Sequence, residues 1–242
     1  MKKKIRIWIR RCDAMKRILD IFIALLVIVL FLPCGLIIAV VLKCTGEGEI
    51  FYCQDRVGKG QKIFKIFKFA TMLKASPSLG AGTITVKNDP RILPMGHFLR
   101  KTKLNEFPQF LNVLIGTMSM VGPRPMTPKN FSYYSEADKN IIGSLTPGIT
   151  GLGSIYFRDE EQLLADKTID ENINYYKDHI APVKAQLEGW YHEKRNVFLD
   201  IKILWMTFIA VIAPRSALVN NFCNAVLQQK GHSHGDTRKG SE

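Results

Sequence analysis

Acidic residues are scarce in this chain, and the cysteine patterns that define several classes of small protein are missing. The 242 residues hold 34 lysines and arginines against 21 acidic residues, a formal net charge of +13. The five cysteines are odd in number and form no C-x-x-C pair, which excludes a disulfide framework and favours reduced thiols. Zinc spacings, RNA-binding signatures, helix-turn-helix patterns and internal repeats are also absent, so the charge favours anionic lipid or phosphorylated substrates over nucleic acid.

Charge of either sign is missing from Ile21 to Leu42, an apolar run bounded by Asp20 and Lys43. A helix needs about 20 residues to cross a bilayer, so the run is long enough. A secretory signal peptide fits poorly, because the run is too long and no small-residue cleavage site precedes the next charged segment. Pro33 lies in the middle, where it removes a helical hydrogen bond and predicts a kink or a reversal.

Both flanks of this apolar run are basic. The lysines and arginines before it are Lys2, Lys3, Lys4, Arg6, Arg10, Arg11, Lys16 and Arg17, and those after it are Lys43, Arg56, Lys59, Lys62, Lys65, Lys68 and Lys74. Because positive charge marks the cytoplasmic side, a helix that dips into the membrane, turns at Pro33 and returns satisfies both flanks. A Pro-kinked transmembrane helix is the alternative.

The rest of the chain predicts an α+β, helix-rich monotopic membrane protein in four parts. These are a basic N-terminus with the re-entrant helix (1–43), a small cytoplasmic catalytic domain (44–196), an interfacial apolar helix (197–214) and a C-terminal tail (215–242) that is disordered from Gly231. Within the catalytic domain we expect strands at Ile50–Cys53 and Ile63–Met72, a basic turn at 54–60, a mobile loop at Ser76–Thr85, a turn at Asn88–Arg91, helices at 136–143 and 170–195, and a Gly-rich connector at Thr146–Gly153.

The stretch from Arg100 to Pro125 carries the strongest chemical signal. A lone carboxylate, Glu106, lies inside a basic approach, and the stretch ends in a stiff turn that presents Arg124. Cations neutralise phosphate oxygens while a carboxylate handles metal or protons, which is what phosphate chemistry needs. The alternative is a helix with solvated charges followed by a proline turn.

Short motifs along the chain resemble those of one family. In order they are Lys16-Arg17-x-x-Asp20, the Pro-broken apolar run, Gln54-x-Arg56-x-Gly58, Phe67-Lys68-Phe69-x-Thr71-Met72, Asn88-Asp89-Pro90-Arg91, Leu104-x-Glu106-x-Pro108-Gln109, Gly122-Pro123-Arg124-Pro125 and Pro147-Gly148-Ile149-Thr150-Gly151. Any one of them is weak, but together, from residue 16 to about 213, they resemble the monotopic polyprenyl-phosphate phosphoglycosyl transferases, the bacterial sugar transferases.

The resemblance implies a reaction, a cofactor and a location. A UDP-sugar would give its phospho-sugar to undecaprenyl phosphate with the help of Mg²⁺, releasing UMP and starting the assembly of an exopolysaccharide, O-antigen or glycoprotein glycan. The site would lie at the cytoplasmic face of the bacterial inner membrane, in contact with membrane lipid. Downstream glycosyltransferases would be further partners. The resemblance also implies a re-entrant membrane helix.

Site residues follow from the matching motifs. The expected catalytic residues are Glu106, Asn105 and Arg124; the phosphate- or nucleotide-binding residues are Arg158, Lys68, Arg91 and Arg56; the metal ligands are Glu106 and Asp89. Structural alternatives are support of a helix N-terminus for Asn105, a backbone contact for Arg124, a surface pair with Asp159 for Arg158, and turn formation for Asp89.

Two positions depart from the family pattern. Asn105 stands where the family carries the Asp nucleophile of an Asp–Glu pair, and an amide binds Mg²⁺ poorly and is a weak nucleophile. Glu106 as the nucleophile, direct transfer with Glu106 as base or metal ligand, and an inactive membrane scaffold that binds polyprenyl phosphate or a partner transferase all remain open. Ala70 replaces an Arg that the family often has, and nearby Lys68 covers part of that loss.

Overall fold

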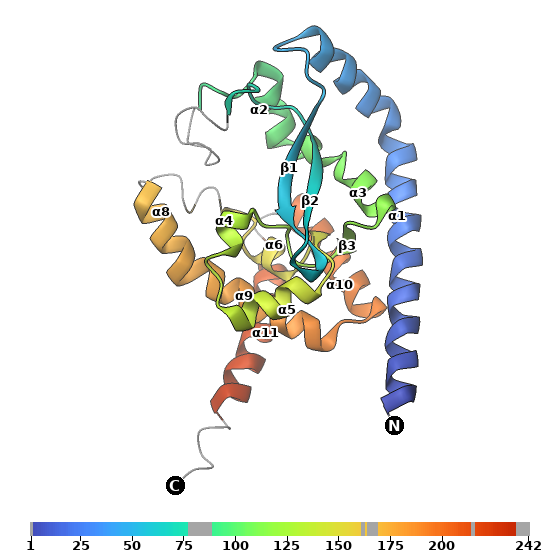
Figure 1. The fold of residues 1–242 in the computed structure, drawn as a ribbon, viewed down its shortest axis with the longest axis vertical. Coiled ribbons are helices and arrows are strands. Elements are labelled where there is room, and N and C mark those ends of the chain that lie inside the picture. Colours follow the sequence, from blue (N-terminus) through green and yellow to red (C-terminus); the bar gives the residue numbers. More distant parts are fainter. Residues whose placement is uncertain (1, 77–88, 161–162, 164–168, 214–215, 236–242) are drawn as a thin grey trace.

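The computed structural model of this chain describes residues 2–76, 89–160, 163, 169–213 and 216–235, with side chains from residue 13 to residue 229 within those ranges. Helices make up most of it, around two small sheets, and one long helix runs along one side of the molecule (Figure 1). The prediction of a helix-rich α+β fold is confirmed.

The elements have these bounds. They are α1 (Lys2–Cys44), β1 (Phe51–Val57), β2 (Ile63–Phe69), α2 (Pro94–Lys101), α3 (Gln109–Ile115), β3 (Ser119–Val121), α4 (Pro128–Phe131), α5 (Glu136–Ser144), β4 (Gly148–Thr150), α6 (Leu152–Tyr156), α8 (Ile169–Tyr175), α9 (Ala181–Lys194), α10 (Val197–Ile212) and α11 (Ala217–Gly235). Turns of 3₁₀ helix lie at Lys59–Gln61 and Leu104–Glu106, and a π-helical turn at Tyr176–Ile180 joins α8 to α9. The predicted helices at 136–143 and 170–195 are therefore confirmed.

The apolar N-terminal run forms a single helix, α1, with Pro33 inside it. Figure 1 shows α1 running up the side of the molecule and bending in its second half before the chain enters β1. Proline removes one hydrogen bond of a helix, and the remaining bonds hold the two halves together as one bent element. The expected kink is compatible with this bend, and reversal inside a membrane stays a prediction.

Two pairs of strands support the centre of the molecule. The strands β1 and β2 form an antiparallel hairpin in which Phe51 faces Phe69 and Val57 faces Ile63. The residues 54–57, expected in a turn, are thus strand. The strands β3 and β4 pair in parallel, so the Gly-rich connector at Thr146–Gly153 contains a strand that the sequence analysis missed. Gly148 allows this pairing, because a Cβ there would lie 2.2 Å from the backbone nitrogen of Gly122.

The C-terminal segment contains a helix that was not expected from the sequence. It forms α11, which buries Val219, Cys223 and Val226 in the main core. The helix is described to Gly235, disorder at the end of the tail stays a prediction, and residues 236–242 lie outside the described part. Most of the predicted Ser76–Thr85 loop, and Asn88 of the predicted turn, also lie outside it.

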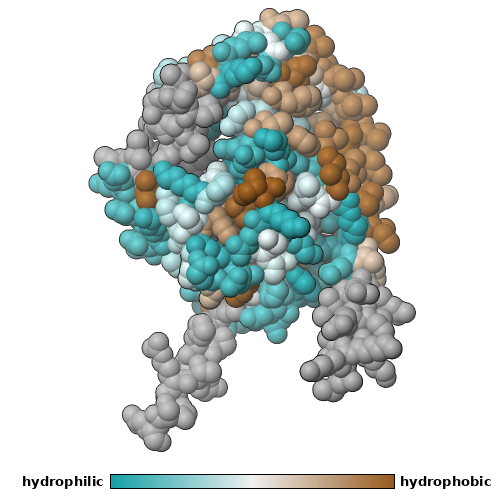
Figure 2. Space-filling view, viewed as in Figure 1, coloured by the Kyte–Doolittle hydropathy of each residue, from teal (hydrophilic) through white to brown (hydrophobic). Residues whose placement is uncertain are grey.

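An apolar surface covers one side of the protein. The segment Asp13–Cys44 of α1 is long and apolar enough to cross a membrane, and only 17% of its most apolar window is buried. Figure 2 shows the corresponding hydrophobic band along α1. The helix α10 exposes Phe198 and Trp205 while it buries Asp200 and Ile203, as expected for a helix between core and interface. These surfaces fit a membrane-associated protein.

Candidate active site

The turn that carries Glu106 is built by local sequence. The helix α2 ends at Lys101, and Lys103 then takes a left-handed conformation with φ of 60°. The 3₁₀ turn Leu104–Glu106 follows, and Pro108 precedes the first turn of α3, where its lack of an N–H costs nothing. Glu106 therefore lies in a tight junction between two helices, and its position is fixed by backbone geometry.

Three segments of the chain meet at the Glu106 carboxylate. Arg124, from the loop after β3, places Nη2 2.6 Å from Oε1 and Nη1 3.4 Å from Oε2. Lys68, from β2, places Nζ 3.5 Å from Oε1. The Glu106 side chain is 18% exposed and that of Arg124 is 44% exposed, so the group is accessible to solvent. The structure thus brings together three of the residues that the sequence predicted.

A fourth predicted residue, Arg56, joins this group through electrostatics. It donates hydrogen bonds to the Pro125 carbonyl at 3.0 Å and to Gln54 Oε1 at 2.5 Å. Burial, and then the charge of Arg124, lower the pKa of Arg56 to about 10, while Glu106 acts in the opposite direction. Arg56, Lys68 and Arg124 therefore surround a single carboxylate, and the group has a surplus of positive charge.

The pKa values show which charge states this group prefers. Burial lowers the pKa of Lys68 to about 8, against the effect of Glu106. Burial alone would raise the pKa of Glu106, but Arg124 and Lys68 outweigh it and hold that pKa far below its usual range. Glu106 is therefore ionised at neutral pH. It can bind a cation or attack phosphorus, but a carboxylate with so low a pKa is a weak general base.

Asn105 is buried beside this carboxylate. Among the described residues its Oδ1 has no hydrogen-bond partner, and neither has Nε2 of the buried Gln109. The residue before α3 is Pro108, and no side chain caps that helix. The alternative in which Asn105 supports the helix N-terminus is therefore wrong, and its amide oxygen stays available to a ligand.

Asp89 and Arg91 are bound to each other. Arg91 Nε lies 2.8 Å from Asp89 Oδ1, Nη2 lies 2.6 Å from Oδ2, and Nη1 donates to the Ser76 carbonyl at 2.8 Å. Both carboxylate oxygens of Asp89 thus accept from one guanidinium, and a metal ion at Asp89 would have to displace it. The ligand role of Asp89 and the phosphate-binding role of Arg91 stay predictions.

Arg158 lies in a different environment. It is placed against α11, with Nη1 3.1 Å from Asn220 Oδ1 and 3.4 Å from the Ile155 carbonyl, and Nε is 3.6 Å from Asp159. The pair with Asp159 is the structural alternative considered from the sequence. Phosphate binding by Arg158 stays a prediction.

The Lys16-Arg17-x-x-Asp20 motif, to which the sequence assigned no role, has a structural one. Lys16 Nζ lies 2.8 Å from Asp200 Oδ2, and Arg17 donates to the carbonyls of Val113 and Leu114 at 2.5 and 2.8 Å. Asp20 accepts from the backbone N–H of Met120 at 3.0 Å. The motif therefore fastens α1 to the domain that holds Glu106.

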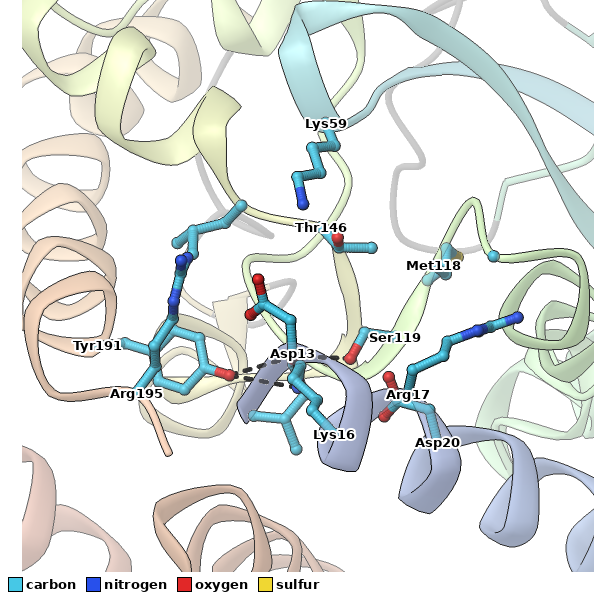
Figure 3. A pocket seen from close by; sticks show the side chains of 13 residues that line it. Asp13, Lys16, Arg17, Asp20, Lys59, Met118, Ser119, Thr146, Tyr191 and Arg195 are labelled. Atoms are coloured by element: carbon cyan, nitrogen blue, oxygen red, sulfur yellow. Dashed lines mark hydrogen bonds between the residues drawn. The ribbon is translucent and has the colours of Figure 1, made fainter. Parts of the chain in front are cut away.

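A cavity of about 190 Å³ lies beside this joint, between α1 and the end of α9. Figure 3 shows Lys16, Arg17 and Asp20 along its lower edge, Tyr191 and Arg195 beside them at the left, and Lys59 and Thr146 above. The residues that line it do not include Glu106 or Arg124. The cavity therefore lies at the contact between α1 and the rest of the domain, and it is separate from the Glu106 carboxylate.

Comparisons with known proteins identify relatives of this chain. The sequence model of a family described as "Bacterial sugar transferase" matches residues 11–214. The chain is 34% identical over 207 residues to a UDP-glucose:undecaprenyl-phosphate glucose-1-phosphate transferase of Klebsiella pneumoniae, covering 84% of this chain and 41% of the relative. It is 30% identical to the exopolysaccharide production protein ExoY of Rhizobium meliloti, covering 84% and 87%.

A shorter relative matches part of the chain. It is the putative undecaprenyl-phosphate N-acetylgalactosaminyl 1-phosphate transferase of Bacillus subtilis, 37% identical over 153 residues, covering 63% of this chain and 82% of the relative. The chain spans about two fifths of the length of the Klebsiella relative.

Proposed function

This chain belongs to the bacterial sugar transferase family, and from that premise we propose that it transfers the phospho-sugar of a UDP-sugar to undecaprenyl phosphate. The products are a polyprenyl diphosphate sugar and UMP, and the reaction starts the assembly of a glycan such as an exopolysaccharide. The name of the Klebsiella relative, a UDP-glucose:undecaprenyl-phosphate glucose-1-phosphate transferase, supports these substrates.

The observation that carries the proposal is the charge around Glu106. Arg124 at 2.6 Å and Lys68 at 3.5 Å contact one carboxylate, and Arg56 lies close enough for its pKa to respond to both Glu106 and Arg124. One negative charge leaves two positive charges uncompensated. A diphosphate entering this site would supply the missing negative charge, and the preorganised donors would stabilise charge that builds up on the phosphate during transfer.

Atoms and charges balance in either of two routes. An oxygen of the acceptor phosphate attacks the sugar-linked phosphorus directly, and the bond to the second phosphate breaks to release UMP. Alternatively, Glu106 attacks that phosphorus first, UMP leaves, and the acceptor phosphate then displaces the carboxylate. Arg124 would stabilise the transferring phosphate in both routes. The low pKa of Glu106 favours a role as nucleophile or cation ligand over a role as base.

A magnesium ion at this site would have to share the Glu106 carboxylate with Arg124, which contacts both of its oxygens. The described residues contain no cluster of three histidine, cysteine or acidic side chains, so a magnesium ion would be held by Glu106 together with phosphate oxygens of the donor. One carboxylate combined with substrate phosphates is a common way to bind this ion. Bound there, it would supply further neutralisation of the phosphate charge.

The membrane placement is part of the same proposal. The acceptor has a lipid tail, so its phosphate is presented at the membrane surface. The exposed apolar faces of α1 and α10 support an orientation in which the domain rests at that surface. We propose that α1 dips into the cytoplasmic leaflet of the bacterial inner membrane and returns, and that downstream glycosyltransferases receive the product.

The test is UMP release by the purified protein in lipid nanodiscs. The assay contains undecaprenyl phosphate, Mg²⁺ and, one at a time, UDP-glucose, UDP-galactose, UDP-N-acetylglucosamine and UDP-N-acetylgalactosamine. We expect release with at least one donor, dependent on the acceptor, and none from the Glu106→Gln variant. Release from no donor, with acceptor binding intact, would instead support a scaffold that binds polyprenyl phosphate.

A further inference from the structure

A second cavity, of about 100 Å³, adjoins the cations that surround Glu106. Arg56 and Arg124 line one side of it together with the loop that follows β3. Side chains of α6, α9 and the π-helical turn line the rest, among them Ser154, Glu188 and Tyr176. A ligand whose phosphates contact Arg124 could therefore extend directly into this space.

Glu188, on α9, is the most unusual residue in the cavity wall. It is only 3% exposed, and its Oε1 accepts a hydrogen bond from the Gly153 N–H at 3.0 Å. Its Oε2 is buried and has no partner among the described residues. Buried carboxylate oxygens are almost always satisfied, so one left without a partner at a cavity calls for a ligand.

Two further polar atoms of the same cavity share this property. The buried atoms Ser154 Oγ and Arg56 Nε also have no hydrogen-bond partner within the described part of the chain. Gly153 makes room for the arrangement, because a Cβ at that position would lie 2.9 Å from Glu188 Oε1. Three residues that line this cavity therefore each carry a buried polar atom without a partner in the described part of the chain: a carboxylate oxygen, a hydroxyl and a guanidinium nitrogen.

We propose that this cavity binds the sugar of the UDP-sugar donor, and that Glu188 and Ser154 select the sugar by hydrogen bonds to its hydroxyl groups. The inference rests on the proposed function and assigns the sugar part of the same substrate. Arg56 and Arg124 would contact the phosphate that carries the sugar, at the mouth of the cavity. Glu188 would then lie beyond the reacting phosphorus, where it binds substrate without taking part in bond making.

The chemistry of the wall favours a sugar over a phosphate. A carboxylate repels phosphate but accepts hydrogen bonds from hydroxyl groups, and a serine can donate to or accept from the same groups. Burial raises the pKa of Glu188 to about 7, so near neutral pH the group exists in both accepting and donating forms. Tyr134 and Tyr176 also line the cavity and add aromatic side chains to its wall.

Lys184 is the cation nearest to this carboxylate along α9. It is paired with Glu160 at 2.5 Å and lies 5.3 Å from the centre of the Tyr176 ring. Glu160 is therefore its direct ion-pair partner, and Lys184 acts on Glu188 only by lowering its pKa against the larger effect of burial. This distribution separates a phosphate-binding side, at Arg56 and Arg124, from a hydroxyl-binding side.

Equilibrium binding tests the assignment without requiring turnover. Calorimetry would measure the dissociation constants of UDP, UDP-glucose, UDP-galactose and UDP-N-acetylgalactosamine for the protein in nanodiscs. Wild type should bind at least one UDP-sugar more tightly than UDP. Glu188→Gln keeps the acceptor for the Gly153 N–H, and Ser154→Ala keeps the backbone. Each should reduce the preference for that UDP-sugar by about tenfold or more while changing UDP affinity less than twofold.

A control and a second measurement make every outcome decisive. Glu136→Gln, at a side chain on α5 that is 83% exposed, should behave as wild type. Thermal unfolding checks each variant, and Ser154→Ala carries the test if Glu188→Gln fails to fold. The proposal is overturned if wild type shows no preference over UDP, if the variants keep it, or if they weaken UDP and UDP-sugars equally, which would assign the cavity to the nucleotide. If wild type prefers a UDP-sugar, both variants lose that preference and wild type releases no UMP, only the proposed function is refuted.

Discussion

Lys16 Nζ lies 2.8 Å from Asp200 Oδ2, joining the membrane-associated helix α1 to α10 across 184 residues of sequence. The same ammonium donates to the Val121 carbonyl at 2.9 Å, and the Tyr191 hydroxyl donates to the other oxygen of Asp200 at 2.6 Å. Burial raises the pKa of Asp200 even though Lys16 and Tyr191 lower it. Burying this ion pair therefore costs free energy. Removing one partner should destabilise the protein more than replacing both partners with apolar residues.

Replacing Lys16 with methionine should destabilise the protein by about 3–5 kcal/mol, because Asp200 would remain as an unpaired buried charge. The double variant Lys16→Met/Asp200→Leu should recover most of that loss. Denaturant unfolding in detergent measures both effects, and Lys62→Met, at an exposed residue of the hairpin turn, is the control. Equal stability of Lys16→Met and the control would show that the pair holds nothing in place.

Arg124 should matter far more than a neighbouring surface cation. Its guanidinium contacts Glu106 at 2.6 Å, and loss of one preorganised donor typically lowers a catalytic rate by about 10²–10³. Arg124→Ala should show that loss in UMP release while membrane association is unchanged. Lys101→Ala, at an exposed residue of α2, should lose little. Similar losses of UMP release in the two variants would mean that the rate depends on net charge and not on the position of the Arg124 guanidinium.

The roles of Glu106 and Asn105 can be distinguished by two substitutions that exchange an acid and an amide. Glu106→Gln should abolish UMP release, since the amide offers neither a charge for a cation nor a nucleophile. Asn105→Asp should keep or raise turnover, because Arg124 and Lys68 leave positive charge for a second carboxylate. It should also allow a phospho-sugar adduct to be trapped on residue 105, detected by mass spectrometry.

The opposite results would be informative. Turnover that survives Glu106→Gln would rule out that residue as the catalytic carboxylate. A lower rate for Asn105→Asp would show like-charge repulsion between adjacent carboxylates, and hence a site adapted to asparagine. Activity in Asn105→Asp alone, with an inactive wild type, would indicate a natural loss of catalysis.

Glu188 should make stability depend on pH. Burial raises its pKa from 4.5 to about 7, so between these values the folded state binds a proton that the unfolded state has released. The free energy of unfolding should therefore fall as pH rises through this window, by on the order of 3 kcal/mol in total. Urea unfolding at several pH values should show a smaller fall for Glu188→Gln than for wild type. Identical slopes would mean that Glu188 titrates normally.

The topology of α1 can be read from cysteine accessibility in a variant without the native cysteines. Asp13→Cys and Lys62→Cys lie on either side of the apolar run. Both should resist a membrane-impermeant reagent added to intact cells, because both flanks are basic. Pro33→Leu should favour spanning and expose one of them. Labelling of only one site without that change would establish a simple span.

Sequence alone predicted features that depend on neighbouring residues. The apolar run, its proline, the helices near 136–143 and 170–195 and the hairpin strands all follow from composition and periodicity over short windows. The β4 strand was missed because its signal is only three residues long and rich in glycine, and its pairing with β3 depends on backbone approach at Gly122 and Gly148. The helix α11 was missed because its buried residues, such as Val219 and Cys223, are few among polar ones.

By itself, the sequence determined that a basic chain with one long apolar helix carries Glu106 among cations, since charge, hydropathy and turn chemistry are local properties. Tertiary structure decided which of those cations meet the carboxylate: Arg124 and Lys68 do, while Arg158 is held against α11. It also revealed Glu188 at the second cavity, which no motif marks. Such contacts join residues far apart in the chain, and only the packing of whole helices and strands brings them within hydrogen-bonding distance.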